Sequence, residues 1–163
     1  MSGTNWFDEH ATGAVGGKGP PRRESLMDRA DEAQGWLRKC QDNIESAGIL
    51  RRLGSLAGMV DRAYFAMFDA AKAMGAADGK DYPPCSGWLD AFDEIFVRSG
   101  RVQSQTLADL REAYRLRGQA AYGVPHEGRI SAEVADLVLL KAQEFVSVAE
   151  QFVKQGGSTS GCS

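Results

Sequence analysis

The stretch that decides the fold runs from Leu53 to Met74 and reads LGSLAGMVDRAYFAMFDAAKAM. Its large apolar side chains recur at steps of three and four residues, the spacing that places them along one side of an α-helix. Small residues such as Gly58, Ala63 and Ala70 lie among them and allow a neighbouring helix to approach closely. We therefore expect a closely packed helix with a buried face formed by Leu53, Leu56, Val60, Tyr64, Met67, Phe68, Ala71 and Met74.

The residues before this stretch predict another amphipathic helix. Ser25 is a suitable N-cap, because its hydroxyl oxygen can accept from the backbone N–H groups of the first turn, and Gly48 is expected to end the helix. Cys40 falls within the apolar stripe, so we expect it to be a small core residue. The stripe is formed by Leu26, Ala30, Ala33, Leu37, Cys40, Ile44 and Ala47.

Three further helices are expected after the stretch that ends at Met74. Gly75 to Pro84 is predicted to be a loop, since prolines interrupt a helix. A short third helix with Trp88 and Phe92 in the core is expected to close at Gly100. A fourth is expected from Thr106 to Tyr122, with Thr106 and Asp109 as a weak capping box and Gly123 and Pro125 as its stop. Ser131 is expected to cap the last helix, whose buried side is formed by Val134, Leu137, Val138, Lys141, Phe145, Val148 and Phe152.

No segment alternates with a period of two for long enough to predict a strand, so we expect an all-α bundle of about five helices. Residues 1–24 and 155–163 are rich in Gly, Ser and other polar or turn-forming residues, and they hold too few apolar groups to offset the entropy of ordering them. We therefore expect a disordered arm at 1–24, one bundle at 25–154 and a disordered tail at 155–163.

The composition excludes several classes of protein. Because 19 basic residues face 22 acidic ones, for a net charge of −3, any contact with nucleic acid has to come from a local basic cluster. No apolar run approaches the ~18 residues of a membrane span, and Asp8 and Glu9 stand where a secretory signal would need an apolar core. The three cysteines are scattered without a CxxC pair. We therefore expect a cytoplasmic protein without a membrane segment, a metal site or a cofactor.

Two segments resemble a known family. Residues 61–73, DRAYFAMFDAAKA, resemble the second helix of HEPN-domain proteins, whose small prokaryotic members read similar to NRAYYAMF. Residues 116–123, LRGQAAYG, look like that group's Leu-Arg-x-x-Ala-Asp-Tyr-Gly segment, and ISAE at 130–133 is similar to the start of its closing helix. The resemblance covers about residues 25–154. It implies an up-and-down helical bundle that forms a homodimer and that is often encoded beside a minimal nucleotidyltransferase, as toxin and antitoxin.

The resemblance also implies a site. Many HEPN proteins are metal-independent endoribonucleases whose signature is an arginine followed a few residues later by a histidine, and the dimer brings two such motifs into one cleft. Arg117 matches the arginine, Tyr122 stands where the histidine is expected, and His126 lies beyond the usual spacing. Cys85 occupies a position where the small prokaryotic group often has another histidine. Both usual proton-transfer positions are therefore altered.

The chemistry assigns a role to each candidate catalytic residue. Cleavage of RNA through its 2′-hydroxyl needs a proton acceptor, a proton donor and positive charge on the phosphate, and the planar guanidinium of Arg117 suits the last task. Tyr122, with an ordinary pKa of about 10, is a poor base at neutral pH but can donate a hydrogen bond or stack on a nucleobase, so Tyr122 or His126 would assist Arg117. The alternatives are a solvated helix charge for Arg117 and a buried ring for Tyr122.

Helix geometry separates these two residues. Five residues along an ideal helix rotate by roughly 140°, so Arg117 and Tyr122 do not share a face. They can converge only if the last helical turn loosens, which Gly118 and Gly123 would permit, or if the cleft lies between two protomers.

Other basic residues are candidates for binding nucleic acid. Arg111 and Arg115 lie one helical turn apart and would project from the same side, either as part of an RNA-phosphate groove or as a solubilising face with intrahelical pairs. Arg62 is a further candidate for contact with nucleic acid. The alternative is that Asp61 and Arg62, beside Tyr64, form an ion pair or hydrogen bond that organises a helix interface.

Three functions are compatible with these features. The first is a HEPN-type toxin or defence protein acting on RNA, as a weak metal-independent endoribonuclease. The second is a non-catalytic HEPN subunit that binds nucleotide or RNA and pairs with a nucleotidyltransferase or another effector. The third is a helical adaptor tethered by its tails. The altered histidine position favours the second over a vigorous nuclease, and the retained Arg117 favours either over the third.

Overall fold

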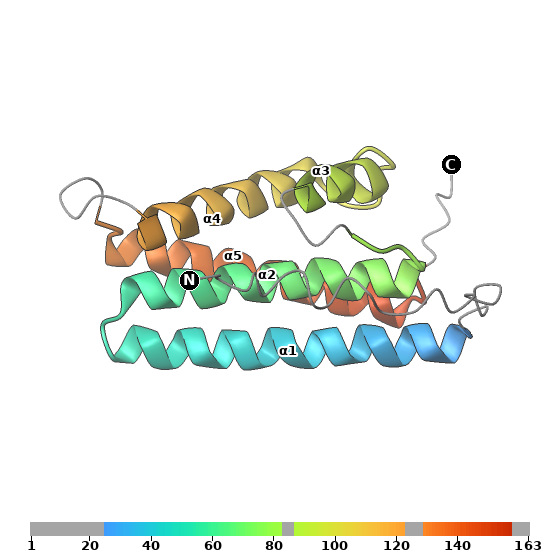
Figure 1. Ribbon diagram of the computed structural model, residues 1–163, viewed down its shortest axis with the longest axis horizontal. Coiled ribbons are helices and arrows are strands. Elements are labelled where there is room, and N and C mark those ends of the chain that lie inside the picture. The colour runs from blue at the N-terminus through green and yellow to red at the C-terminus, as the bar shows by residue number, and fades with distance from the viewer. Residues whose placement is uncertain (1–24, 83–86, 123–128, 158–163) are drawn as a thin grey trace, which may run out of the picture.

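The computed structural model describes residues 25–82, 87–122 and 129–157, and every regular element in these ranges is a helix (Figure 1). The elements are α1 (Leu26–Arg52), α2 (Leu56–Asp78), α3 (Trp88–Phe92), the π-helical segment η1 (Asp93–Val97), α4 (Ser104–Tyr122) and α5 (Ala132–Lys154). No strand occurs in these three ranges. The prediction of an all-α protein with about five helices is confirmed.

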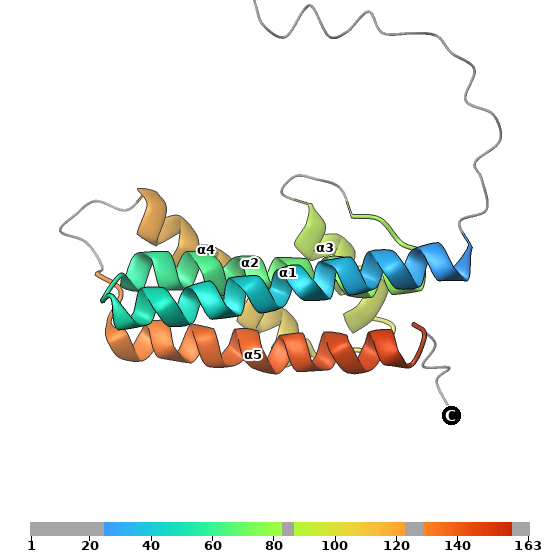
Figure 2. The same cartoon turned by 90° about the horizontal axis from the view of Figure 1, so that it is seen from below.

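Helix α2 is the centre of the bundle. Helices α1 and α2 run antiparallel side by side, α5 lies along the same pair, and α3, η1 and α4 cover α2 from the opposite side (Figures 1 and 2). The long helices reverse direction from one to the next, so the bundle is of the up-and-down type. Because α2 contacts α1, α4 and α5, most of its surface is buried, which agrees with its many small side chains.

The predicted caps of the first and last helices are confirmed. Ser25 Oγ accepts from Asp28 N at 3.1 Å while Asp28 Oδ2 accepts from Ser25 N at 3.0 Å, which makes a reciprocal capping box at the start of α1. Ser131 Oγ accepts from Val134 N at 3.2 Å at the start of α5. Cys40 is fully buried, as expected, and burial raises the pKa of its thiol to about 12, so it is an inert core residue.

Two predicted helix ends are wrong, and both involve glycine. Helix α1 continues through Gly48 to Arg52, so Leu53 lies in the turn and is 75% exposed instead of facing the core. Helix α2 continues through Gly75 to Asp78. A Cβ at position 75 would lie 2.8 Å from the Tyr82 ring, so this glycine lets the following segment pack back onto the helix instead of ending it.

The third and fourth helices also differ from expectation. The third is not one α-helix up to Gly100, because its second half is the π-helical segment η1, closed by a hydrogen bond from Arg98 N to Asp93 O at 2.8 Å. Helix α4 begins at Ser104, two positions before the predicted start. Within it, Thr106 N donates to the Gln103 carbonyl and Asp109 accepts from Gln105, so Thr106 and Asp109 are not the predicted capping box.

The buried face of α5 is rotated relative to the prediction. Val134, Leu137 and Val148 are 38%, 54% and 39% exposed. Alanines lie on the buried face instead, because their small side chains let α5 approach α2 closely. The prediction differed because it was based on the spacing of the larger apolar side chains. The buried residues of α5 are Ala135, Val138, Ala142, Phe145, Val146, Ala149 and Phe152. Across the three described ranges, the helices are too short or too polar to cross a bilayer.

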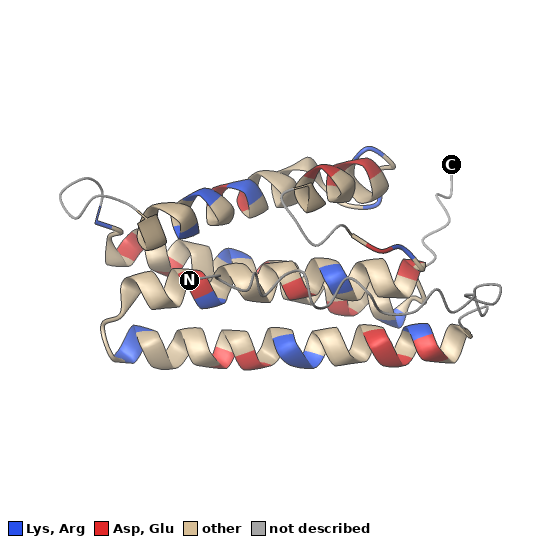
Figure 3. Cartoon of the chain, in the orientation of Figure 1, with Lys and Arg blue, Asp and Glu red and all other residues tan. Residues whose placement is uncertain are grey.

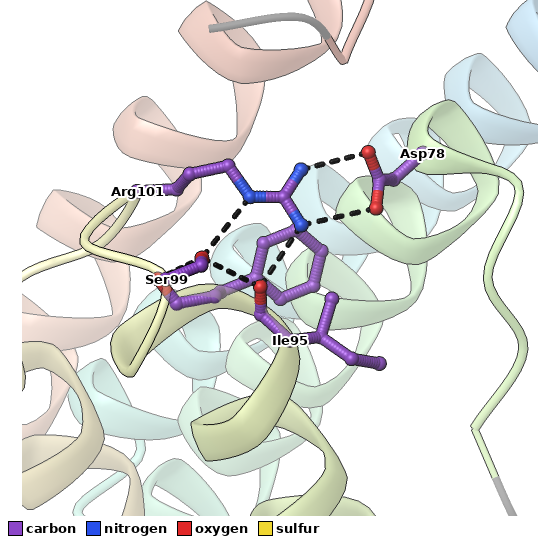
Figure 4. A network of polar contacts seen from close by, with 5 residues as sticks. Asp78, Ile95, Ser99 and Arg101 are labelled. Atoms are coloured by element: carbon purple, nitrogen blue, oxygen red, sulfur yellow. Dashed lines mark hydrogen bonds and ion pairs between the residues drawn. The ribbon is translucent and has the colours of Figure 1, made fainter. Parts of the chain in front are cut away.

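A half-buried ion pair joins α2, η1 and α5 at one end of the bundle (Figure 4). Arg101 donates through Nη1 and Nη2 to the two carboxylate oxygens of Asp78, at 2.7 and 3.1 Å, and through Nη2 to the Ile95 carbonyl at 2.9 Å. Its guanidinium also lies over the rings of Phe96 and Phe152, at 4.7 and 5.7 Å. One arginine therefore holds together three elements that are distant in the sequence.

We predict that Arg101→Ala lowers the free energy of unfolding by about 3 kcal/mol, because it leaves the Asp78 side chain, which is only 16% exposed, without its partner. The matched control is Arg51→Ala. Arg51 is also bidentate to its carboxylate, Asp136, but the two side chains are 55% and 41% exposed, so solvent screens the pair and we expect a much smaller loss. Urea denaturation followed by circular dichroism measures both, and equal losses would contradict the prediction.

Candidate functional site

Arg117 lies at the contact between α4 and α2. Its Nε donates to Asp61 Oδ1 at 2.8 Å, and the two side chains are 29% and 31% exposed. The pair is therefore neither a solvated surface contact nor a buried one. Arg117 is held against α2 at the edge of the bundle, where a ligand in solution can still reach it.

Two aromatic rings of α2 lie beneath the guanidinium. The Cζ atom of Arg117 is 5.3 Å from the ring centre of Tyr64 and 4.9 Å from that of Phe65, within the range of cation–π attraction. The spacing explains the arrangement, because Tyr64 and Phe65 follow Asp61 by three and four residues and so share its face of α2. On α4, Tyr114 precedes Arg117 by three residues and packs against Tyr64 with ring centres 5.8 Å apart.

A second guanidinium adjoins the same carboxylate. Arg62 Nη2 is 3.9 Å from Asp61 Oδ2, and Arg62 Nη1 donates to the side-chain oxygen of Asn43 on α1 at 3.4 Å. The Arg62 side chain is 47% exposed and its guanidinium lies 5.9 Å from the Phe65 ring centre. Two cations thus flank one anion, which leaves a net positive charge over an aromatic floor. We call Asp61, Arg62, Tyr64, Phe65, Tyr114 and Arg117 the α2–α4 site.

Arg111 and Arg115 lie on the exposed part of α4, and each is paired with a carboxylate of its own. Arg111 Nη2 donates to Asp90 of α3 at 3.1 Å, and Arg115 donates to both oxygens of Glu112 at 2.9 and 2.7 Å. These hydrogen bonds hold the pKa of the Glu112 carboxyl below its usual value. Figure 3 shows the same mixture, with basic and acidic residues interspersed along α4. Among the described residues, neither arginine forms a hydrogen bond or ion pair with the α2–α4 site.

Tyr122 is 86% exposed, so the alternative in which its ring is buried at the helix end is wrong. Helix α4 remains α-helical through Tyr122, and its last turn does not loosen toward Arg117. The structure therefore does not bring Tyr122 to the α2–α4 site of the same chain. His126, Cys85, Gly123 and Pro125 lie outside the described residues.

Tyr64, one of the two rings beneath Arg117, is buried and carries a hydroxyl group. Burial raises the pKa of its phenol above the ordinary value, although a hydrogen bond with Trp88 and the charge of Arg117 both act in the opposite direction. Tyr64 is therefore protonated at neutral pH and is a hydrogen-bond donor, not a base. Within the described residues, no group of three or more His, Cys, Asp or Glu side chains is arranged to hold a metal ion.

Comparison with known proteins places the chain in a family. The HEPN domain family matches residues 33–153, most of the helical part of the chain. The chain belongs to the HEPN domain family. A similar protein is the UPF0332 protein glr0978 of Gloeobacter violaceus, 27% identical over 135 residues, which are 83% of this chain and 98% of that protein. Another is the protein named "Putative toxin MJ0605" of Methanocaldococcus jannaschii, 25% identical over 128 residues, which are 78% of this chain and 93% of that protein.

Sequence reasoning missed part of the α2–α4 site. It singled out Arg117 and Arg62 and gave Asp61 an ion pair at a helix interface, but it did not identify Arg117 as the partner of Asp61. It placed Tyr64 on the buried face of its helix and did not identify it, or Tyr114, as a ring beside Arg117. The available signal was the spacing on α2, where a carboxylate is followed at three and four residues by two aromatic rings, a face that suits a guanidinium from a neighbouring helix.

We predict that Tyr64 ionises above the ordinary value of about 10, because burial outweighs the attraction of Arg117 for the phenolate. Tyr64→Phe removes this phenol alone. The difference in phenolate absorbance between the wild type and this variant, followed as the pH is raised, gives the midpoint for Tyr64. A midpoint at or below 10 would mean that Arg117 dominates the environment of the ring.

Proposed function

We propose that this HEPN chain is a toxin or defence protein that acts on RNA, with Arg117 binding a phosphate of the RNA backbone. The observation that carries the proposal is the α2–α4 site, where a part-exposed arginine is fixed over two rings and joined by a second cation, Arg62. A pre-oriented guanidinium binds phosphate oxygens with little loss of side-chain freedom, and a nearby exposed ring such as Tyr114 offers a surface for an unpaired base. The relative named as a toxin supports the same direction.

The proposed reaction is a weak, metal-independent cleavage of RNA. The 2′-hydroxyl oxygen attacks the adjacent phosphorus atom, and the bond to the 5′ oxygen of the next nucleotide breaks. Arg117 stabilises the charge that develops on the phosphate oxygens. His126 or Tyr122 assists, the histidine as proton acceptor or donor and the tyrosine as hydrogen-bond donor.

The proposal includes a homodimer. A single chain leaves Tyr122 exposed and apart from Arg117, because α4 stays helical to its last residue. For Tyr122, a second copy is the route to Arg117 that remains, since α4 stays helical through Tyr122 and the helix end does not loosen. This agrees with the dimer that the family resemblance implies.

The second candidate is a non-catalytic HEPN subunit that binds nucleotide or RNA and pairs with a nucleotidyltransferase antitoxin or another effector protein. A specific observation favours it: the residue at the motif position is an exposed tyrosine, and the tyrosine ring beneath Arg117, that of Tyr64, is a protonated phenol. Neither supplies a proton acceptor at neutral pH. The α2–α4 site would then bind phosphate without cleaving the chain.

We predict that Arg117→Ala abolishes growth inhibition when the protein is expressed in a bacterial host, because the phosphate loses its cation. We expect the variant to remain folded, with a loss of about 1 kcal/mol in the free energy of unfolding, since the pair is only half-buried. Arg51→Ala, which removes an exposed bidentate pair between α1 and α5, is the matched control and should stay as toxic as the wild type. An Arg117→Ala variant that is equally toxic would reject the proposal.

The two candidates differ in what the purified protein does to RNA. Incubation with total RNA shows fragments if the chain is a nuclease, and Arg117→Ala should remove them. Incubation with ATP and a candidate nucleotidyltransferase shows covalent addition of nucleotide if the chain is its partner. Fragments that persist in Arg117→Ala would come from a contaminating nuclease and would count against the first candidate.

We also predict that Arg111 and Arg115 contribute to RNA affinity through charge alone. Replacing both by alanine should weaken retention of single-stranded RNA at moderate salt and reduce the salt dependence of binding, because two cations near the backbone are lost. The magnitude should be modest, since Asp90 and Glu112 already neutralise them. Replacement of Arg38 and Lys39 on exposed positions of α1 is a charge-matched control. If the two double variants weakened RNA retention equally, the effect would come from the net charge of the protein, and a local contribution of Arg111 and Arg115 would be contradicted.

A further inference from the structure

Arg117 is held differently from the other strongly paired arginines of the chain. In the described part of the chain, three arginines each use two nitrogen atoms on one carboxylate, which is the strongest geometry for such a pair. These pairs are Arg51–Asp136, Arg101–Asp78 and Arg115–Glu112. Arg117 donates to Asp61 through Nε alone. Among the residues that the structure describes, Nη1 and Nη2 of Arg117 have no hydrogen-bond acceptor.

This single contact fixes the guanidinium without occupying it. The hydrogen bond to Asp61 sets the direction of the Nε edge, and the rings of Tyr64 and Phe65 set the plane. The two Nη groups then form the remaining edge, which has the geometry to donate to two oxygens of one phosphate. The cost of ordering a long arginine side chain is thereby met before any ligand arrives.

We infer that Asp61 is a positioning residue that presents the Nη1–Nη2 edge of Arg117 to a ligand phosphate. This inference rests on the proposed function and adds the role of a residue that the family signature does not include. A positioning role explains why the Asp61 carboxylate lies beside a proposed phosphate site, although two negative groups repel each other and this repulsion alone would weaken binding. Arg62, 3.9 Å from the other oxygen of Asp61, offsets the negative charge, so the group remains cationic.

A purely structural pair would behave differently. If Asp61 served only to tie α2 to α4, its removal would lower stability, and RNA affinity would fall only as far as the folded fraction falls. If Asp61 only repelled phosphate, any neutral replacement would strengthen binding. A positioning role makes the two neutral replacements unequal, because asparagine keeps an oxygen that accepts from Arg117 Nε and alanine does not.

The test compares Asp61→Asn, Asp61→Ala, Arg117→Ala and the double variant Asp61→Ala/Arg117→Ala, all as the full-length protein. The probe is a fluorescein-labelled single-stranded RNA of about 12 nucleotides, and the readout is its anisotropy over a range of KCl concentrations. Thermal melting of each variant gives the folded fraction at the assay temperature. A parallel arm uses ATP and inorganic phosphate as competitors, which separates recognition of RNA from recognition of a free phosphate compound.

We expect Asp61→Asn to bind RNA at least as tightly as the wild type, because the neutral amide still orients Arg117. Asp61→Ala should bind about five- to tenfold more weakly than Asp61→Asn, and its salt dependence should fall by about 0.7 in log–log slope, the value for one lost phosphate contact on a single strand. The double variant should bind like Arg117→Ala alone, because a misplaced arginine and an absent one are equivalent.

The outcomes separate the two levels of the argument. If Arg117→Ala weakens binding while Asp61→Ala and Asp61→Asn are equal, the positioning role is overturned and the proposed function stands. If Asp61→Ala weakens binding further in the Arg117→Ala background, Asp61 acts by another route and the inference fails. If Arg117→Ala binds RNA as tightly as the wild type, the proposed function fails and the positioning role with it. Competition by ATP at concentrations where inorganic phosphate has no effect would assign the site to a nucleotide.

Discussion

The fold depends on one constraint, the enclosure of α2 by the other helices. A helix packed on several sides cannot leave charged side chains in a low-dielectric interior, since an unpaired buried charge is costly. Each charged group of α2 at or near the buried surface therefore meets a partner from a different part of the chain. Asp61 pairs with Arg117 of α4, and Asp69 accepts from Asn43 of α1. Lys72 donates to the Tyr82 carbonyl in the segment after α2, and Asp78 pairs with Arg101 in the segment between η1 and α4. These pairs set the positions of the surrounding elements.

The α2–α4 site follows from the same constraint, with one difference. The pair of Asp78 with Arg101 uses both oxygens and both terminal nitrogens, and further contacts to Ile95 complete the arginine, so nothing remains for a ligand. The pair of Asp61 with Arg117 uses one nitrogen and lies nearer to solvent. The structural pair and the proposed binding site thus share the same chemistry, and they differ in how many guanidinium nitrogens the carboxylate occupies.

The sequence predicted the helical class, the caps at Ser25 and Ser131 and the family, because these depend on local spacing and on contiguous motifs. It placed helix ends wrongly at Gly48 and Gly75, since the effect of a glycine depends on what packs against it, and Tyr82 is not visible in the pattern. For the site, it identified Arg117 from a motif. It could not identify the partner, because 56 positions separate Asp61 from Arg117 and only the packing of α4 on α2 joins them.

The exposed Tyr122 bears directly on what the site can do. An endoribonuclease needs a group that takes a proton from the 2′-hydroxyl, and a phenol of ordinary pKa is almost entirely protonated at neutral pH. A guanidinium held over aromatic rings still binds phosphate strongly, because that task needs charge and orientation but no proton transfer. Under the proposed function, a tyrosine at the position of the motif histidine therefore weakens proton transfer more than it weakens phosphate recognition. A chain that binds RNA without cleaving it is expected to hold the RNA for longer than a nuclease would. Long retention suits the second candidate function, a non-catalytic subunit that acts by staying bound and by pairing with an effector protein.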